Sequence, residues 1–316
     1  MKRVLALVFM MAACGGGKPV ASVEIPLPQS QQAQSGVYAV RLSHPSWVGE
    51  RDRWIITADE ERITTTRRGK DVVSDDHMRK RGRLDAIATV LTLDAHGGPQ
   101  SVSLEVADLS YIDDGKELVH KKRGTIQVTR AKHEDDAKVT FDGNEANDDM
   151  RQAVKLVLTL TNGGPTDDEI MGTSAPQRIG SHWKIDGKRA AEALQEEEGG
   201  EMMNGANVSG DAWLESVGQV NGVDCLDVHA VFHIDGLDVT SRVPGGVAEV
   251  ARITASYSAK FPLDTSKSRV SDHQLIEATI KLHTPSPNGE ITMATNFASR
   301  RDGIYEVLNP EGGASR

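Results

Sequence analysis

The sequence is poor in aromatic residues, cysteines and long apolar runs. It has 4 Trp, 4 Tyr and 5 Phe among 316 residues, so a buried core must consist mainly of Val, Ile, Leu and Ala. Since no apolar run reaches about 18 residues, a protein with several membrane-spanning helices is excluded. The two cysteines are too few for a small disulfide-rich scaffold.

Basic residues are also scarce relative to acidic ones. The chain has 36 Lys and Arg against 46 Asp and Glu, a net charge of −10. Residues 166–316 hold most of the excess, and this argues against nucleic acid as a partner. One basic stretch, residues 79–83 (Arg-Lys-Arg-Gly-Arg), is interpreted as a solvated loop or an exposed strand face. Contact with lipid phosphates is the alternative.

The N-terminus has the pattern of a signal peptide. Residues 1–3 are positively charged, and the apolar run over residues 4–13 is too short to span a bilayer. The small residues before Cys14 resemble the bacterial lipobox, although Met11 stands where that motif usually has Leu. The resemblance implies cleavage before Cys14 and acylation of its thiol, with palmitate among the chains. The alternative is an ordinary secretory signal with a coincidental cysteine.

The second cysteine supports the lipoprotein interpretation. If Cys14 carries lipid, Cys225 has no disulfide partner, whereas in a merely secreted protein the two could pair. Stable anchoring needs more than one acyl chain, and a multiply acylated cysteine supplies them. We therefore predict a protein anchored in a membrane of the cell envelope through Cys14. Gly15, rather than Asp, follows Cys14, which favours the outer membrane, with the folded part outside the cytoplasm.

Composition divides the chain into four parts. Residues 1–13 are the signal peptide, and residues 14–36 are the lipidated cysteine and a tether rich in Gly, Pro, Ser and Gln, spanning roughly 26 Å as a flexible coil. Residues 37–163 form a first β-rich half that ends in a helix, and residues 164–316 form a second. The pattern Pro-x-x-[Val/Ile]-Gly occurs at residues 45–49 and 176–180, which leaves both a duplication and chance open.

Alternating apolar and polar residues predict a mainly β fold. The expected architecture is a large antiparallel sheet, a sandwich or a half-barrel, with two short helices and two halves that could be similar. The helices are expected over residues 147–160 and 188–198. The strand patterns cover residues 87–93, 101–106, 125–130, 139–141, 253–261, 276–282 and 291–297.

The second half resembles a family of uncharacterised bacterial secreted proteins and lipoproteins. The resemblance rests on the acidic pair within residues 167–172 and on Pro-x-x-Ile-Gly-x-x-Trp, which ends at Trp183. Residues 221–226 and 261–267 resemble later strand elements of the same family. The family has no assigned activity, so the resemblance implies fold and location only. Since an indole ring buries a large area, Trp183 is expected to be a largely buried core anchor.

Sequence signatures of enzymes are missing. The chain has no Gly-x-Ser-x-Gly, no His-Glu-x-x-His and no phosphate-binding loop. The acidic run over residues 142–149 lacks the Gly and Glu that an EF-hand needs at its sixth and twelfth positions, and it is interpreted as a turn followed by a helix cap. We expect neither catalysis nor a cofactor.

One predicted strand concentrates ligand-type residues. From Cys225 onwards one face carries Asp227, His229, His233 and Asp235, whereas the opposite face is entirely apolar. Neighbours on one face lie about 6.6 Å apart, so a pair could share an ion, but a zinc site needs three or four ligands. His273 and His283 could supply more only from another strand. We interpret these residues as a solvated face that binds no metal, with Cys225 accessible on it.

Three functions are compatible with these features. The expected one is a non-catalytic lipoprotein that acts as a scaffold or partner-binding module. The alternative is a carrier of a lipid or another apolar ligand, and a metal-dependent enzyme is the minor alternative. An unfilled apolar cavity between sheet and helix would favour the carrier, whereas a filled core would favour the scaffold. Convergence of three or more of the His and Asp side chains would favour the enzyme.

Overall fold

Tight turns join several neighbouring strands. A computed structural model describes residues 36–94, 97–130, 137–158, 160, 165–195, 207–237, 246–286 and 289–308. In it, Asp114-Gly115, Asp142-Gly143 and Asn221-Gly222 have positive φ at both residues. Such pairs favour two-residue hairpin turns whose twist matches that of the strands. The turn predicted at Asp142-Gly143 is therefore confirmed.

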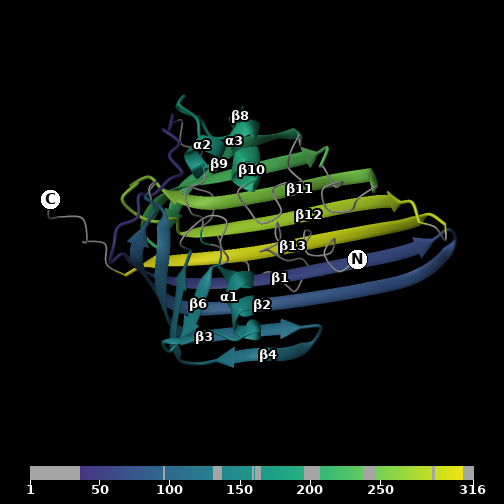
Figure 1. Cartoon of the computed structure of the whole chain (residues 1–316). Helices are drawn as coiled ribbons and strands as arrows, with labels where there is room; N and C mark the ends of the chain where they lie inside the picture. Colours follow the sequence, from purple (N-terminus) through teal and green to yellow (C-terminus); the bar gives the residue numbers. More distant parts are fainter. Residues whose placement is uncertain are drawn as a thin grey trace.

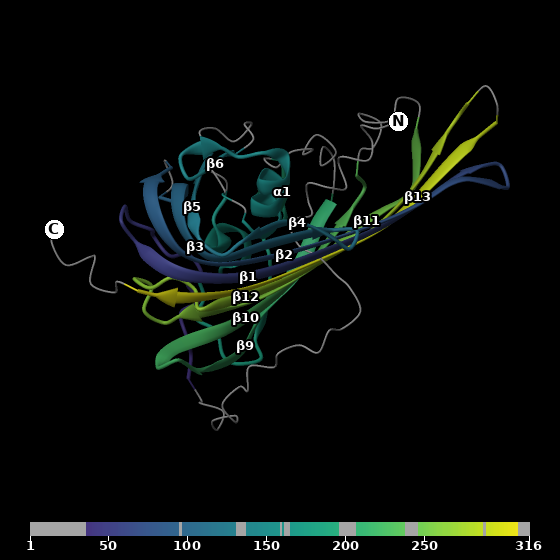
Figure 2. The same ribbon diagram turned by 90° about the horizontal axis from the view of Figure 1, so that it is seen from below.

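The strands of the described residues form one antiparallel sheet of thirteen strands that is not closed. Its order is β7-β6-β5-β3-β2-β1-β13-β12-β11-β10-β9-β8, with β4 paired to β3. The sheet curves strongly, and α1 lies within the curve (Figures 1 and 2). The predicted mainly β antiparallel fold is thus confirmed in its open, curved form. The strands are β1 (Arg51–Arg68), β2 (Asp71–Leu93), β3 (Pro99–Asp113), β4 (Lys116–Lys121), β5 (Gly124–Thr129), β6 (Lys138–Phe141), β7 (Asn144–Glu145), β8 (His182–Lys184), β9 (Asn207–Val220), β10 (Val223–Asp235), β11 (Val247–Pro262), β12 (Ser271–Thr284) and β13 (Ile291–Val307).

The described residues contain three helices, α1 (Asp148–Val157), α2 (Asp167–Met171) and α3 (Gly187–Gln195). The Asn147 side chain accepts a hydrogen bond from the Met150 amide, as the predicted cap requires. The short helix α2 was not predicted. Thr166 and Glu169 form a capping box at its start, and the sequence Thr-x-x-Glu is the signal that could have revealed it.

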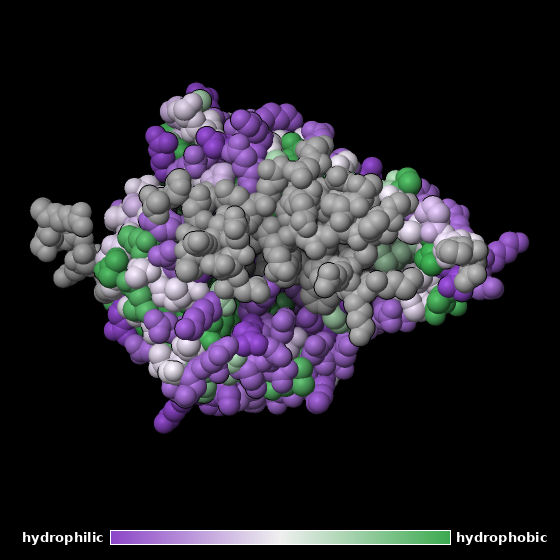
Figure 3. Space-filling view, in the orientation of Figure 1, coloured by the Kyte–Doolittle hydropathy of each residue, from purple (hydrophilic) through white to green (hydrophobic). Residues whose placement is uncertain are grey.

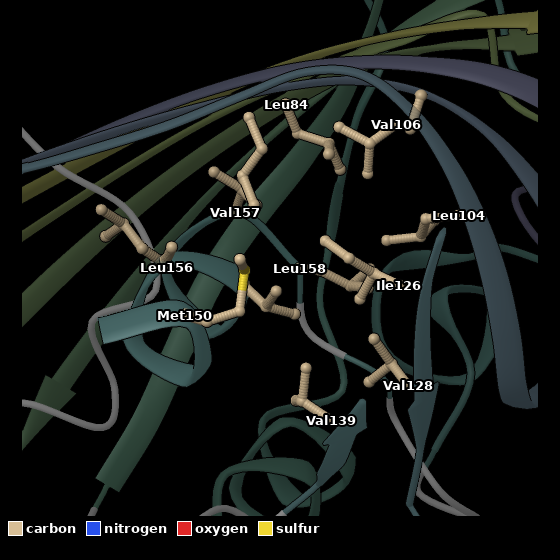
Figure 4. Packing of buried hydrophobic residues seen from close by; sticks show 14 of the residues in the cluster. Leu84, Leu104, Val106, Ile126, Val128, Val139, Met150, Leu156, Val157 and Leu158 are labelled. Atoms are coloured by element: carbon tan, nitrogen blue, oxygen red, sulfur yellow. The ribbon is translucent and has the colours of Figure 1, made fainter. Parts of the chain in front are cut away.

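Alternation along the strands buries two apolar clusters. The α1 cluster joins α1 to β1–β6, and Figure 4 shows Met150 and Val157 of the helix facing Leu84 and Ile126 of the sheet. Gly82 lies beneath α1, where a Cβ atom would approach Val157 Cγ1 to 2.8 Å. In Figure 3 the surface over α1, β3 and β4 is mostly hydrophilic, as expected for a helix that covers its cluster.

The α3 cluster joins α2 and α3 to β9–β13. Val40 and Leu42, which precede β1, also belong to it, so the start of the described chain packs on the second half. Buried polar residues of the central strands lie between the two clusters, among them Glu60, Arg62 and Thr64. The sheet runs continuously across both halves through the pairing of β1 with β13. The predicted boundary between residues 163 and 164 lies outside the described residues.

The two copies of Pro-x-x-[Val/Ile]-Gly adopt the same turn. Gly49 and Gly180 both have positive φ, and each donates its amide to the carbonyl of a neighbouring strand, Val90 or Leu214. The tryptophans that follow differ in place: Trp54 lies in central strand β1, whereas Trp183 lies in edge strand β8. The local motif therefore repeats, but it leads into different positions of the sheet.

Candidate ligand-binding cavity

A cavity of about 690 Å³ lies between the inner face of the sheet and helices α2 and α3. This volume is within the range of about 300–1,000 Å³ that is typical of small-molecule sites. Strands β10–β12 contribute Phe232, Ile234, Ile253, Ala255 and Ile276 to its lining. The helices contribute Ile170, Met171, Ala190, Ala193 and Leu194.

The strand register explains the apolar part of the cavity. Phe232 pairs with Ala255, and Ala255 pairs with Ile276, so one row of inward side chains crosses three strands. The small Ala255 leaves room in the middle of this row. Phe232 remains half-buried, whereas Ala230 and Ile234 on the same face are fully buried. An aromatic ring on the inner face thus lies against space that protein atoms do not fill.

A hydrogen-bonded network forms one polar part of the lining. Arg269 Nη1 donates to the Tyr257 hydroxyl at 2.8 Å and to Asp272 Oδ2 at 3.3 Å. Tyr305 donates to the same Asp272 oxygen at 3.0 Å. Asp167 of α2 lies 3.8 Å from Arg269, and burial raises the pKa of Asp167, which Arg269 only partly offsets. Burial also raises the pKa of Tyr305 to about 12, so this hydroxyl stays protonated at neutral pH.

A second polar part of the lining consists of His44, Glu50 and Asp52. His44 contacts Glu50 Oε1 through Nε2 at 2.6 Å and the Thr265 carbonyl through Nδ1 at 3.2 Å. The protonated form of His44, which carries hydrogen on both nitrogens, can donate to both oxygens. Burial alone would lower the pKa of His44, but the hydrogen bond and charge of Glu50 outweigh burial and raise it.

The carboxyl groups of Glu50 and Asp52 are incompletely satisfied. Their residues are 4% and 6% exposed, and Ser268 donates to Asp52 Oδ2 at 2.8 Å. Within the described part of the chain, Glu50 Oε2 and Asp52 Oδ1 are buried without a hydrogen-bond partner. Burial, with the nearby charge of Glu50, raises the pKa of Asp52 to about 6, although the Ser268 hydrogen bond opposes the change. The cavity is thus apolar on one side and rich in carboxylates and tyrosines on the other.

The predicted histidine strand does not contribute to this cavity through its polar face. The apolar face of β10 is inward, with Leu226, Val228, Ala230 and Ile234 buried, as predicted. Asp227, His229, His233 and Asp235 lie on the opposite face of the sheet. No group of three or more potential metal ligands occurs among the described residues.

Asp227, His229 and Asp235 of β10 have partners on neighbouring strands. Asp227 bonds Lys260 at 2.6 Å and His229 at 3.2 Å, and Asp235 pairs with Arg252. The His229 ring stacks on Trp213 at 5.3 Å between ring centroids, and Trp213 stacks on His182 at 5.4 Å.

The two later histidines pair elsewhere. His273 contacts Asp302, and His283 contacts Glu249 and Glu290. The structure therefore does not bring these residues to one point with His229.

Two sequence-based expectations about single residues are wrong. Cys225 is 2% exposed rather than accessible, and its thiol donates to the Val223 carbonyl at 3.4 Å. Burial raises the pKa of its thiol to about 11. Trp183 is only half-buried, since it lies in an edge strand, and its indole nitrogen donates to the Met171 carbonyl at 2.7 Å.

The residues that define the cavity were mostly missed in the sequence. Glu50, Asp52, Arg269 and Asp272 belong to no motif, and Tyr257 was predicted only as part of the strand over residues 253–261. The sequence of β1 contains one weak signal for the cavity. Asp52 lies an even number of residues before the core residues Ile56 and Ala58, so its side chain is on the same face of the strand. The basic stretch proved to be part of β2, with Arg79 and Arg81 contacting Asp59. Cys14, the predicted lipid attachment site, lies outside the described residues.

No helix within the described ranges has both the length and the apolar character needed to cross a bilayer. No family model matches the chain, and no curated protein matches it. Among solved structures, one similar chain is from a study of lipid–protein interactions in lipovitellin, at 10% identity and a TM-score of 0.35. The match covers 86% of this chain but only 26% of the lipovitellin chain.

Two further solved structures are similar at lower scores. A DUF1329 family protein from Desulfovibrio piger is 8% identical, with a TM-score of 0.13 and coverage of 82% of this chain and 87% of that one. The COG4313 outer membrane channel from Pseudomonas putida F1 is 10% identical, with a TM-score of 0.19 and coverage of 83% and 97%. At such low scores we infer neither function nor ancestry from these proteins.

Proposed function

We propose that this protein binds or carries an amphipathic, lipid-like molecule in the cell envelope. We also propose that lipid attached to Cys14 anchors the protein in the outer membrane. The observation that carries the proposal is the cavity of about 690 Å³ between the inner sheet face and α2 and α3. This cavity is unfilled and partly apolar, and a cavity of that kind favours a carrier over a scaffold. The activity is binding, without catalysis and without a cofactor.

The apolar lining supports a hydrocarbon tail. Each buried methylene group contributes about 0.8 kcal/mol, so a twelve-carbon chain gains about 10 kcal/mol before the entropic cost of association. Phe232, Ala255 and Ile276 would contact such a tail. The tyrosines and carboxylates at the other side of the cavity would contact a polar head.

Filling the cavity tests the proposal. Ala255→Trp places an indole ring in the middle of the apolar row. Ala298→Trp adds the same volume on the opposite face of the sheet, at a residue that is also half-buried. The full chain would be extracted from membranes with a styrene–maleic acid copolymer, and bound molecules would be counted by native mass spectrometry.

We expect wild type and Ala298→Trp to retain a bound amphiphile that Ala255→Trp lacks. Circular dichroism and the urea midpoint would show that both variants fold. If wild type carries no amphiphile, or if Ala255→Trp carries as much as wild type, the carrier proposal is wrong. Specific co-purification of an envelope protein without a bound amphiphile would then support the scaffold.

A further inference from the structure

Two buried carboxylates in the cavity wall each have one oxygen that accepts no hydrogen bond. In a protein interior, nearly every buried polar atom has a hydrogen-bond partner, and leaving a charged acceptor unsatisfied is costly. Glu50 Oε2 and Asp52 Oδ1 are exceptions within the described residues, and both side chains line the same cavity. A donor that arrives with a ligand would remove this cost.

The geometry allows one ligand group to reach both acids. Glu50 and Asp52 are two residues apart on an extended chain, so their Cα atoms are about 6.6 Å apart and their side chains lie on the same face. The other oxygen of each group is occupied, by His44 in one case and by Ser268 in the other. The two remaining oxygens therefore need a group with at least two donors.

The charge of the buried lining is negative. Its charged residues that are buried are Glu50, Asp52 and Asp272. The arginines and the lysine of the lining are more exposed than these acids: Arg41 is exposed, Arg301 is half-buried, and the side chains of Lys267 and Arg269 are 36% and 39% exposed. His44 already contacts Glu50, and Asp272 already accepts hydrogen bonds from Arg269 and Tyr305. Asp52 is the acid that no cation within the described residues contacts directly.

We infer that the ligand has a primary ammonium head, which donates N–H bonds to Glu50 Oε2 and Asp52 Oδ1 while its hydrocarbon tail lies along Phe232, Ala255 and Ile276. This inference rests on the proposed function and names the chemical class of the ligand. An ammonium group has three donors and a positive charge, which matches two acceptors of negative charge. A carboxylate head has no donor and would meet like charges.

The test uses photoreactive probes with the same dodecyl tail and different heads. Membranes that contain the full chain would be irradiated with diazirine-bearing dodecylamine, dodecanol or dodecanoic acid, and cross-links would be mapped by peptide mass spectrometry. Each probe is scored as the labelling of a variant relative to wild type, because the different partitioning of the probes into the membrane then cancels. The variant is Glu50→Gln with Asp52→Asn.

The chain offers a matched control. Asp59 and Glu61 are also a carboxylate pair two residues apart on β1, but they lie on the outer face of the sheet and contact Arg79 and His77. Asp59→Asn with Glu61→Gln removes the same charge without touching the cavity.

We expect labelling by the dodecylamine probe to fall at least about tenfold in the Glu50/Asp52 variant, since charge-assisted hydrogen bonds are lost. Labelling by the dodecanol probe should change less than twofold, and the control variant should change neither. A trimethylammonium probe, which has the charge without N–H donors, should show a smaller fall. Equal falls for the two cationic probes would overturn the hydrogen-bonding part of the inference.

Failure of this inference is distinguishable from failure of the proposed function. If the dodecanol probe labels the cavity of wild type but dodecylamine labelling is the same in wild type and variant, the ligand class is wrong and the carrier remains. A fall in dodecanoic acid labelling in the Glu50/Asp52 variant as large as the fall in dodecylamine labelling also overturns the ligand class. If no probe labels the cavity of wild type, the carrier proposal itself fails.

Discussion

Asp52 is a residue whose burial in the cavity wall lowers the stability of the folded state. Its pKa rises from 3.8 to about 6 because burial disfavours the charged form. The folded state therefore binds more protons than the unfolded state between about pH 4 and pH 6. In this window the free energy of unfolding falls as pH rises.

Asp52→Asn should remove this pH-dependent fall in the free energy of unfolding. An amide cannot ionise, so we expect the variant to be more stable than wild type at pH 7, by up to about 3 kcal/mol. The difference should shrink towards pH 4. Urea unfolding of both proteins between pH 4 and pH 8 measures it. A variant that is less stable than wild type at pH 7 would show that Asp52 is not an unfavourable buried charge.

Trp183 is a second residue whose role the structure revises. It is half-buried and donates its indole N–H to the Met171 carbonyl, so it connects edge strand β8 to helix α2. We expect Trp183→Ala to cost about 2–3 kcal/mol, at or below the lower end of values for fully buried Trp. Trp183→Phe should cost about 1 kcal/mol, the value of one hydrogen bond. Denaturation midpoints measure both, and an unchanged midpoint for Trp183→Ala would contradict the anchoring role.

At the scale of elements, Gly82 lets helix α1 approach strand β2 closely. A Cβ at this position would lie 2.8 Å from Val157 Cγ1 and 3.0 Å from Leu156 Cδ2, so Gly82→Ala should cost about 1–2 kcal/mol through overpacking. Gly218, in β9, has no atom within 4 Å of an added Cβ. Gly218→Ala is the control and should be neutral or slightly stabilising. Equal thermal midpoints for the two variants would mean that α1 moves at no cost.

Strand β10 shows that a concentration of ligand-type residues need not be a metal site. Its polar face is engaged by Lys260, Arg252 and the Trp213 ring. We therefore expect the variant with His229→Gln and His233→Gln to lose less than about 1 kcal/mol, as is usual for surface substitutions. The purified protein should carry no stoichiometric metal. Elemental analysis that finds about one zinc per chain, lost in the double variant, would support the enzyme hypothesis instead.

At the scale of the whole molecule, the prediction concerns anchoring. Cys14 follows a positive segment and a ten-residue apolar run that ends in two alanines. Because acylation of this cysteine would supply the membrane affinity, Cys14→Ala should leave the protein unprocessed or mislocalised. Fractionation of cells with antibody detection measures this. Release of the same mature form by wild type and variant would refute lipid anchoring.

Sequence patterning predicted most of the long strands that bury an apolar face, although it missed β9, which buries Val208, Ala212 and Leu214. The alternation in β10, β12 and the start of β13 is clear, because each of these strands meets the core on one side. Strand β1 was missed. Its inward positions include Glu60 and Arg62, which are buried and charged, so the alternation of apolar residues disappears. Burial raises the pKa of Glu60 to about 7, although Lys80 and Arg62 oppose it.

The sequence by itself determined the mainly antiparallel β class, the helix cap at Asn147 and the turn at Asp142-Gly143, because these depend on residues close together in the chain. Only the tertiary structure decided the cavity. Its wall brings together Asp52 of β1, Ser268 before β12 and Tyr305 of β13, and strand order alone sets that proximity. Likewise, the lack of hydrogen-bond donors to one oxygen of Glu50 and one of Asp52 can be recognised only when every neighbouring group is in place. Local pattern cannot specify such a site, because its residues share a location in the fold and no spacing in the sequence.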